Sequence, residues 1–205
     1  LQLANSSLAF LLNTYLIRYG GDIAVSGMGI VNSLQTLLIL PIIGLNQGLQ
    51  PIVSFNYGAE KYDRVKRAVK LAIIAGLIIS TVGFLLSRLI PELLVSLFNR
   101  EPELMKFSVY ALKIWFMGII VAGFQIIAAN FFQAIGMPKR AMVLTLLRQV
   151  IVLMPCIVIF SKYFGIDGVL YAAPVADITS ATVTACFFIP FMKKFTQKKD
   201  NENIA

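Results

Sequence analysis

The longest uncharged run in the chain spans residues 23–59, and it sets the strongest limit on what the chain can fold into. As one straight α-helix this run would be roughly 55 Å long, whereas the hydrocarbon core of a bilayer is about 30 Å thick. The run contains Pro41, Pro51 and several amide side chains. Prolines kink helices, and amides at membrane depth are tolerated where they contact protein or line a water-filled cavity. We therefore expect a long or kinked membrane helix whose polar residues line a cavity.

The composition of the whole chain also indicates a membrane protein. Hydrophobic residues make up 58% of the chain and charged residues 14%, against about 45–50% and about 25% in soluble domains. The net charge is +8, but the basic residues form short clusters between apolar runs, as in the loops of polytopic membrane proteins and unlike a nucleic-acid-binding face. The chain has no histidine, which removes the commonest metal ligand and the usual general base. We predict no nucleic-acid partner, no metal site and no catalytic residue, so the protein is not expected to be an enzyme.

Six apolar runs are expected to cross the bilayer. Their approximate spans are 1–19, 23–59, 71–89, 107–135, 141–160 and 169–192. The pair Gly20-Gly21 is typical of a helix stop and separates the first two spans. Residues 1–192 are therefore predicted to form one all-α lobe of six transmembrane helices, and residues 193–205 a basic tail that we expect to be disordered. Because the chain begins directly with an apolar run, we expect it to be a piece of a longer polypeptide.

The distribution of Lys and Arg predicts the orientation in the membrane. With six spans, twelve of the 18 Lys and Arg residues lie on one side, including those of residues 60–70 and of the tail. The side richer in Lys and Arg is cytoplasmic in most membrane proteins. We therefore expect a multi-pass protein of the plasma membrane with a cytoplasmic C-terminus. A channel or a receptor would share this topology.

Polar side chains gather on one face of several expected spans when residues are placed at about 100° intervals around a helix. The predicted cavity-lining residues are Asn13, Gln35, Asn46, Gln47, Gln50, Gln125, Asn130 and Gln133. The alternative is helix–helix packing, because amides and closely spaced glycines also hold membrane helices together. Seven polar positions in the second span alone favour the cavity.

Asp177 is the only carboxylate well inside an expected span, and Arg148 is the only cation placed comparably. One hypothesis makes them a buried ion pair that holds the last two helices together, in which case Asp177 stays ionised and carries protons poorly. The other makes Asp177 a site for a proton or another cation, because carboxylates within membranes are often functional. The residues leave both hypotheses open.

The sequence resembles the multidrug and toxic compound extrusion (MATE) transporters over nearly its whole length. The resemblance is strongest in GLNQGLQPIVSFNYGAE at residues 44–60, which is followed by KYDRVKR at 61–67 and is similar to the end of the second helix of their C-terminal lobe. Two further segments are similar in the same order, namely NFFQAIGMPKR at 130–140 and GIDGVLYAAPVAD at 165–177.

The resemblance implies a twelve-helix transporter in the membrane lipid, of which this chain is the C-terminal lobe and a missing N-terminal lobe is the partner. It implies export of drugs or other amphiphilic organic cations, driven by H⁺ or Na⁺ as the coupling ion, with no other cofactor. Some members carry a carboxylate in the first or fourth helix of this lobe, but residues 1–19 and 107–133 contain no acid. The coupling site is then either Asp177 or in the other lobe. The alternatives are a lipid-linked glycan flippase of the same superfamily and a non-transporting membrane scaffold.

Overall fold

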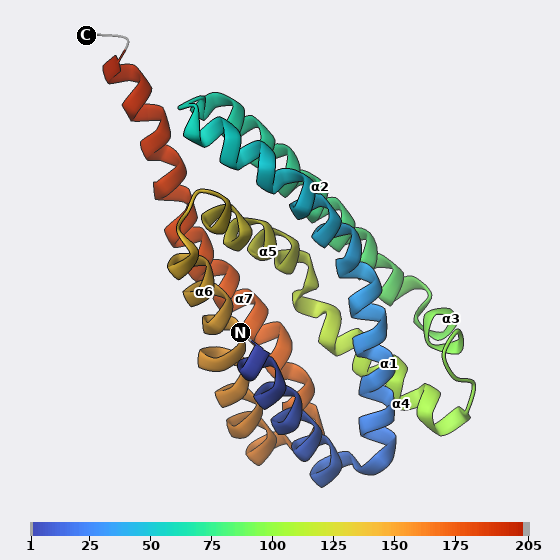
Figure 1. Ribbon diagram of the computed structural model, residues 1–205. Helices are drawn as coiled ribbons and strands as arrows, with labels where there is room; N and C mark the ends of the chain where they lie inside the picture. Colours follow the sequence, from blue (N-terminus) through green and yellow to red (C-terminus); the bar gives the residue numbers. More distant parts are fainter. Residues whose placement is uncertain (1, 203–205) are drawn as a thin grey trace.

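The computed structural model describes the backbone of residues 2–202, and the described residues form helices and short turns without any strand. The elements in chain order are α1 (Gln2–Gly58), α2 (Tyr62–Leu89), α3 (Pro91–Ser96), α4 (Pro102–Trp115), the 3₁₀ turn η1 (Phe116–Gly118), α5 (Ile119–Ala134), α6 (Pro138–Leu146), the π-helical segment η2 (Leu147–Leu153) and α7 (Met154–Glu202). Figure 1 shows them packed side by side in an elongated bundle. The expected all-α membrane fold is confirmed.

The two longest helices each turn back at one glycine. Gly21 in α1 has φ 66° and Gly165 in α7 has φ 60°. Glycine occupies this left-handed region without the steric cost that a side chain would add. In Figure 1 both turns lie at the end of the bundle opposite the start of α2 and the C-terminal part of α7. The turn predicted at Gly20-Gly21 is therefore present.

Four segments of the described chain are long and apolar enough to cross a membrane. They are Gln2–Gly58, Tyr62–Leu89, Pro102–Ala134 and Pro138–Lys193. The first and last contain the turns at Gly21 and Gly165, so each consists of two helical stretches. The connection between α2 and α4 contains the short helix α3.

Two helix boundaries differ from the expectation. Helix α2 begins at Tyr62 and not at residue 71, so the basic cluster that follows residue 60 forms its first turns and is not a loop. Helix α7 continues to Glu202, although the tail from residue 193 was expected to be disordered. Residues 203–205 of that tail lie outside the described residues.

The lobe contains two separate apolar cores. One includes Leu16, Met28 and Leu170, and the other includes Ile42 and Phe131. Five buried polar residues lie between the two cores along α2, α5 and α7: Ser80, Gln125, Asp177, Ser180 and Thr184. We call these five residues the polar layer. It lies part of the way along the membrane-spanning helices and not at their ends.

A close approach of α2 and α5 adjoins this layer. A Cβ added to Gly123 would lie 2.6 Å from the carbonyl oxygen of Gly76 and 2.5 Å from Ser80 Oγ. Small residues at such crossings allow membrane helices to pack backbone against backbone. The contact fixes the part of α5 that carries Gln125.

Candidate functional site

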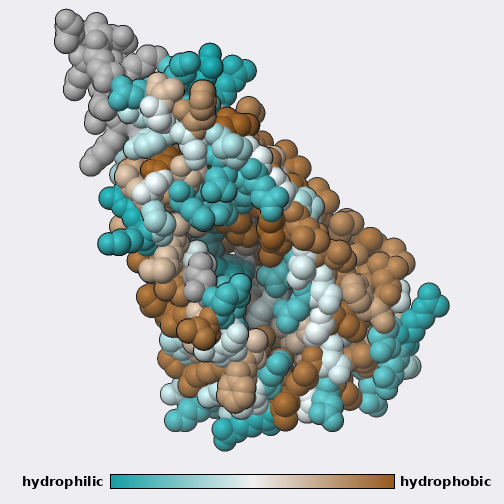
Figure 2. All heavy atoms as spheres, in the orientation of Figure 1, coloured by the Kyte–Doolittle hydropathy of each residue, from teal (hydrophilic) through white to brown (hydrophobic). Residues whose placement is uncertain are grey.

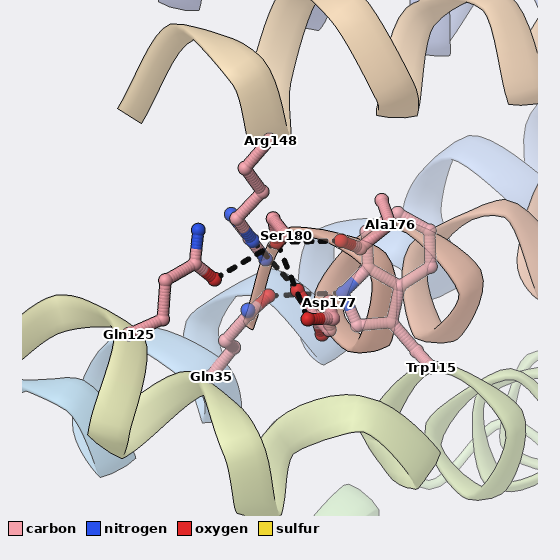
Figure 3. Close-up of polar contacts among 7 residues, drawn as sticks. All are labelled: Gln35, Trp115, Gln125, Arg148, Ala176, Asp177 and Ser180. Carbon is pink, nitrogen blue, oxygen red and sulfur yellow. Dashed lines mark hydrogen bonds and ion pairs between the residues drawn. The ribbon is translucent and has the colours of Figure 1, made fainter. Parts of the chain in front are cut away.

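The centre of the candidate site is an ion pair between the last two membrane-crossing segments. Arg148 Nε lies 2.6 Å from Asp177 Oδ1, with the Asp177 side chain 3% exposed and the Arg148 side chain 25% exposed. Figure 3 shows both side chains pointing toward each other from η2 and α7. Charges at this depth are costly unless they are paired. The structure therefore contains the ion pair of the first hypothesis, with Arg148 on the more accessible side.

The π-helical segment η2 positions Arg148. Residues 147–153 depart from the α-helical hydrogen-bond pattern, and Pro155 follows shortly after them. Proline has no N–H for the carbonyl of residue i−4, which here is Ile151, so the regular ladder cannot continue through this point. Widened π turns are frequently found at functional sites. The π-helix was not predicted from the sequence.

In the 3₁₀ turn η1, the backbone of Gly118 packs directly against the side chain of Asp177. A Cβ added to Gly118 would lie 2.6 Å from Asp177 Cβ, 2.7 Å from Asp177 Oδ2 and 2.9 Å from the Cα of Pro174. Only a glycine leaves room for Asp177 here. The break between α4 and α5 thus helps to form the carboxylate's pocket, a role that the sequence analysis missed.

Ser180 connects Asp177 to Gln125. Its hydroxyl lies 3.1 Å from Gln125 Oε1, 2.5 Å from the carbonyl oxygen of Ala176 and 3.2 Å from that of Asp177. The single hydroxyl proton is shared among these acceptors. Ser180 is fully buried and Gln125 nearly so. The contact links α5 to α7 one turn away from the ion pair.

A second hydrogen bond crosses from α1 to α4. Trp115 Nε1 donates to Gln35 Oε1 at 2.9 Å. A buried indole N–H requires an acceptor, and Gln35 supplies it. Trp115 is three residues before Gly118 along the chain, so this bond lies beside the turn that contacts Asp177 (Figure 3). The only tryptophan of the chain was a signal that the sequence analysis did not use.

The remaining predicted cavity-lining residues lie outside this cluster. Asn13, Gln47, Gln50 and Gln133 are exposed on the surface of the lobe. Asn130 is half-buried and its Nδ2 donates to the carbonyl oxygen of Ile126 in its own helix, at 2.9 Å.

Asn46 differs from the other amides of α1. It is 7% exposed, and its two amide atoms have no hydrogen-bond partner among the residues that the structure describes. Its spacing from Ile42, Leu49 and Val53 places it on the face that packs into the second apolar core. The expectation that all these amides share one open face therefore does not hold for Asn46.

The outer surface is divided by polarity. In Figure 2 the face toward the viewer is hollowed beside the N-terminal segment of α1, and hydrophilic residues gather in and above this hollow. Hydrophobic residues cover the flank formed by α2. In the described part of the chain, no group of three or more His, Cys, Asp or Glu residues could hold a metal ion. The polar groups of the candidate site are amides, hydroxyls, the indole N–H of Trp115 and the Arg148–Asp177 ion pair.

These features define a multi-pass α-helical membrane protein with a polar, ion-paired layer between two apolar cores. The family model described as MatE matches residues 1–159. The chain therefore belongs to the MatE family, as the resemblance in its sequence predicted.

A relative of described function is similar over most of the chain. A "Multidrug export protein MepA" from Staphylococcus haemolyticus is 25% identical over 178 residues, which is 87% of this chain and 37% of that protein. The chain thus spans little more than a third of this curated relative's length.

Solved structures show the same fold. One described as "Crystal structure of MATE in the bent conformation" has a TM-score of 0.89 at 21% identity, covering 96% of this chain and 44% of that one. Another, of the "MATE multidrug transporter DinF-BH", has a TM-score of 0.81 at 35% identity, covering 92% of this chain and 42% of that one.

Proposed function

We propose that the chain is the C-terminal half of an antiporter that exports drugs or other amphiphilic organic cations across the cytoplasmic membrane. Family membership supports this proposal, as do the names of the similar proteins. The chain matches less than half of each similar structure, so a second lobe of the same polypeptide is proposed to complete the transport pathway. The distribution of Lys and Arg supports a cytoplasmic C-terminus.

The coupling ion, H⁺ or Na⁺, is proposed to act at Asp177. The observation that carries this is the buried pair of Asp177 with Arg148. A cation that binds the carboxylate competes with the guanidinium for the same negative charge. Asp177 can thus be paired with Arg148 or bound to the coupling ion. Because Arg148 is on η2 and Asp177 is on α7, these two states favour different positions of the two segments. The coupling ion binds one of these conformations more tightly than the other, and its binding therefore shifts the lobe toward that conformation.

The pairing favours an antiporter over a lipid-linked glycan flippase. A flippase must present free cations to the phosphates of its substrate. Arg148 is the one cation predicted deep in a span, and its charge is neutralised by Asp177. The polar groups around it are amides and hydroxyls, which suit an uncharged or cationic substrate surface.

The test uses the full-length protein that contains this chain, in everted membrane vesicles with ethidium as the substrate. We expect Asp177→Asn to abolish ethidium transport driven by an imposed H⁺ or Na⁺ gradient, while gradient-free ethidium exchange continues. The control is Asp167→Asn on the same helix, where the carboxylate accepts a hydrogen bond from the Tyr110 hydroxyl at 2.9 Å. Wild-type gradient-driven transport in Asp177→Asn would place the coupling site elsewhere, whereas loss of exchange as well would show a purely structural role.

A further inference from the structure

A groove unrelated to the polar layer lies between α6 and α7, near the end of the lobe where α2 begins. It has a volume of about 420 Å³, within the range of small-molecule sites, about 300–1,000 Å³. Its lining residues are Phe132, Lys139, Arg140, Val143, Leu144, Cys186, Phe187, Pro190 and Phe191. Apart from two cations, the lining residues that the structure describes are apolar, and none of them is acidic.

The groove opens away from the ion pair. On an ideal helix, Cys186 and Pro190 lie roughly 180° and 220° around the axis from Asp177. Buried Phe132 and Leu144 form its floor, whereas Val143 and Phe187 on its walls are largely exposed. The groove on this side of α7 is therefore apolar and open to the surroundings of the lobe.

Both cations of the groove lie at the N-terminus of α6, the end at which the helix dipole already places a partial positive charge. Lys139 and Arg140 are in the first turn of α6, directly after Pro138, and this turn contains no acidic residue. The N-terminus of a helix carries a partial positive charge, which disfavours cations and favours anions. The guanidinium of Arg140 lies 5.5 Å from the centre of the Phe191 ring, so it lies beside the apolar wall. An anion at this position would be attracted by both cations and by the N-terminus of α6.

We propose that this groove binds an anionic phospholipid, with the phosphate at Lys139 and Arg140 and an acyl chain along Val143, Phe187 and Pro190. The chemistry matches at each point, because basic pockets between membrane helices on the cytoplasmic side suit anionic headgroups. Four residues of helix separate Arg140 from Leu144, about 6 Å, so the groove runs from the headgroup level into the hydrocarbon region. A transported organic cation is disfavoured by the charge of the same two residues.

The first experiment counts lipids retained by the delipidated full-length protein in native mass spectrometry. Phosphatidylglycerol and phosphatidylcholine are added separately, and inorganic phosphate is added as a competitor. We expect preferential retention of phosphatidylglycerol and a roughly ten- to thirtyfold weaker apparent affinity in Lys139→Gln/Arg140→Gln, because each cation near a membrane surface contributes about 1 kcal/mol. The control is Arg18→Gln/Lys162→Gln, which removes two exposed cations near the Gly21 and Gly165 turns.

The second experiment localises the lipid with the exposed Cys186 in the groove. In a Cys156→Ala background, phosphatidylglycerol is expected to slow maleimide labelling of Cys186, and phosphatidylcholine is not. Equal retention of both lipids, an unchanged affinity of the double variant, or unprotected Cys186 would each overturn the proposal. So would displacement of the lipid by millimolar phosphate, since the site would then bind a free anion. Protection that depends on protein concentration and not on lipid would overturn it too and indicate a second copy of the chain instead.

Discussion

The polar layer around Asp177 and the amides on the second half of α1 both contain uncharged polar side chains, but those of the layer are buried and those of α1 at Gln47 and Gln50 are exposed. Within the layer, Asp177 is paired with Arg148, and Ser180 is hydrogen-bonded to Gln125. On α1, Gln47 and Gln50 point out of the lobe and are exposed. The ion pair and the Ser180–Gln125 contact are therefore formed within the lobe, whereas the two exposed amides of α1 have no such contact with the described buried groups of the lobe.

This difference has a physical consequence in a membrane. Lipid provides no hydrogen bonds, so a polar group must find its partner in protein or in water. In the layer, Asp177, Ser180 and Gln125 find partners on neighbouring segments and therefore contribute to the stability of the lobe, whereas the buried hydroxyls of Ser80 and Thr184 have no hydrogen-bond partner in the described part of the chain. The amides of α1 require water or another protein surface, which is what a transport pathway between two lobes provides. We therefore expect changes in the layer to affect stability, and at Asp177 ion coupling as well, whereas changes in the α1 amides should affect transport with little effect on stability.

The largest effect is expected for Arg148→Met. This substitution leaves the buried Asp177 carboxylate without its counter-charge, and removing one partner of a buried pair costs about 3–5 kcal/mol. The apparent melting temperature of the purified full-length protein should fall strongly. An unchanged melting temperature would show that the carboxylate does not depend on this guanidinium.

The double variant Arg148→Met/Asp177→Leu distinguishes the cost of an unpaired buried charge from the loss of the ion pair itself. Replacing both members of a buried pair by apolar residues of similar size is often neutral for stability. We expect the melting temperature to recover while gradient-driven efflux stays absent. A double variant as unstable as Arg148→Met would contradict the view that the unpaired charge is the cause.

Gly118→Ala should have the next largest effect. The added Cβ would lie 2.6 Å from Asp177 Cβ and 2.9 Å from the Cα of Pro174, and overpacking of this kind costs about 1–3 kcal/mol. The control is Gly29→Ala in α1, where an added Cβ meets nothing within 4 Å. Melting curves should separate the two variants, and equal stability would show that α7 can move away from η1 without cost.

Much of this fold could be predicted from residue patterns. Long apolar runs predicted the membrane helices, and Gly20-Gly21 predicted the turn at Gly21. The start of α2 was predicted too late because the cations after residue 60 suggested a loop. Lys and Arg are good helix formers whose long side chains extend from a helix end to water, so charge alone does not end a helix.

The candidate site was predicted in part. Asp177 and Arg148 were identified because charges inside apolar runs are rare, and their estimated depths allowed a contact. The π-helix η2 and the contact of Gly118 with Asp177 could not be predicted, because both depend on how three segments pack. Asn46 was assigned to the open face because it was grouped with the other amides, although its helical spacing from Ile42, Leu49 and Val53 also places it on the face that packs into the second apolar core.

Ser180→Ala should lower stability by a smaller amount. It removes the donor to Gln125 Oε1 and leaves this buried acceptor unpaired, which typically costs about 1 kcal/mol. The control is Thr182→Ala on the same helix, because the Thr182 hydroxyl is exposed and bonds only its own helix, at the carbonyl of Ile178. A loss in Thr182→Ala as large as in Ser180→Ala would indicate an effect of helix propensity and not of the polar layer.

The smallest effect on stability is expected for Gln47→Leu/Gln50→Leu, because both side chains are exposed and surface substitutions usually change stability by less than about 0.5 kcal/mol. Ethidium efflux should nevertheless fall well below that of the matched exposed control Thr182→Leu. A lower melting temperature would show that the amides hold the two lobes together. Wild-type efflux would contradict cavity lining, because a substrate pathway that contacts these amides must respond when two polar groups in it become apolar.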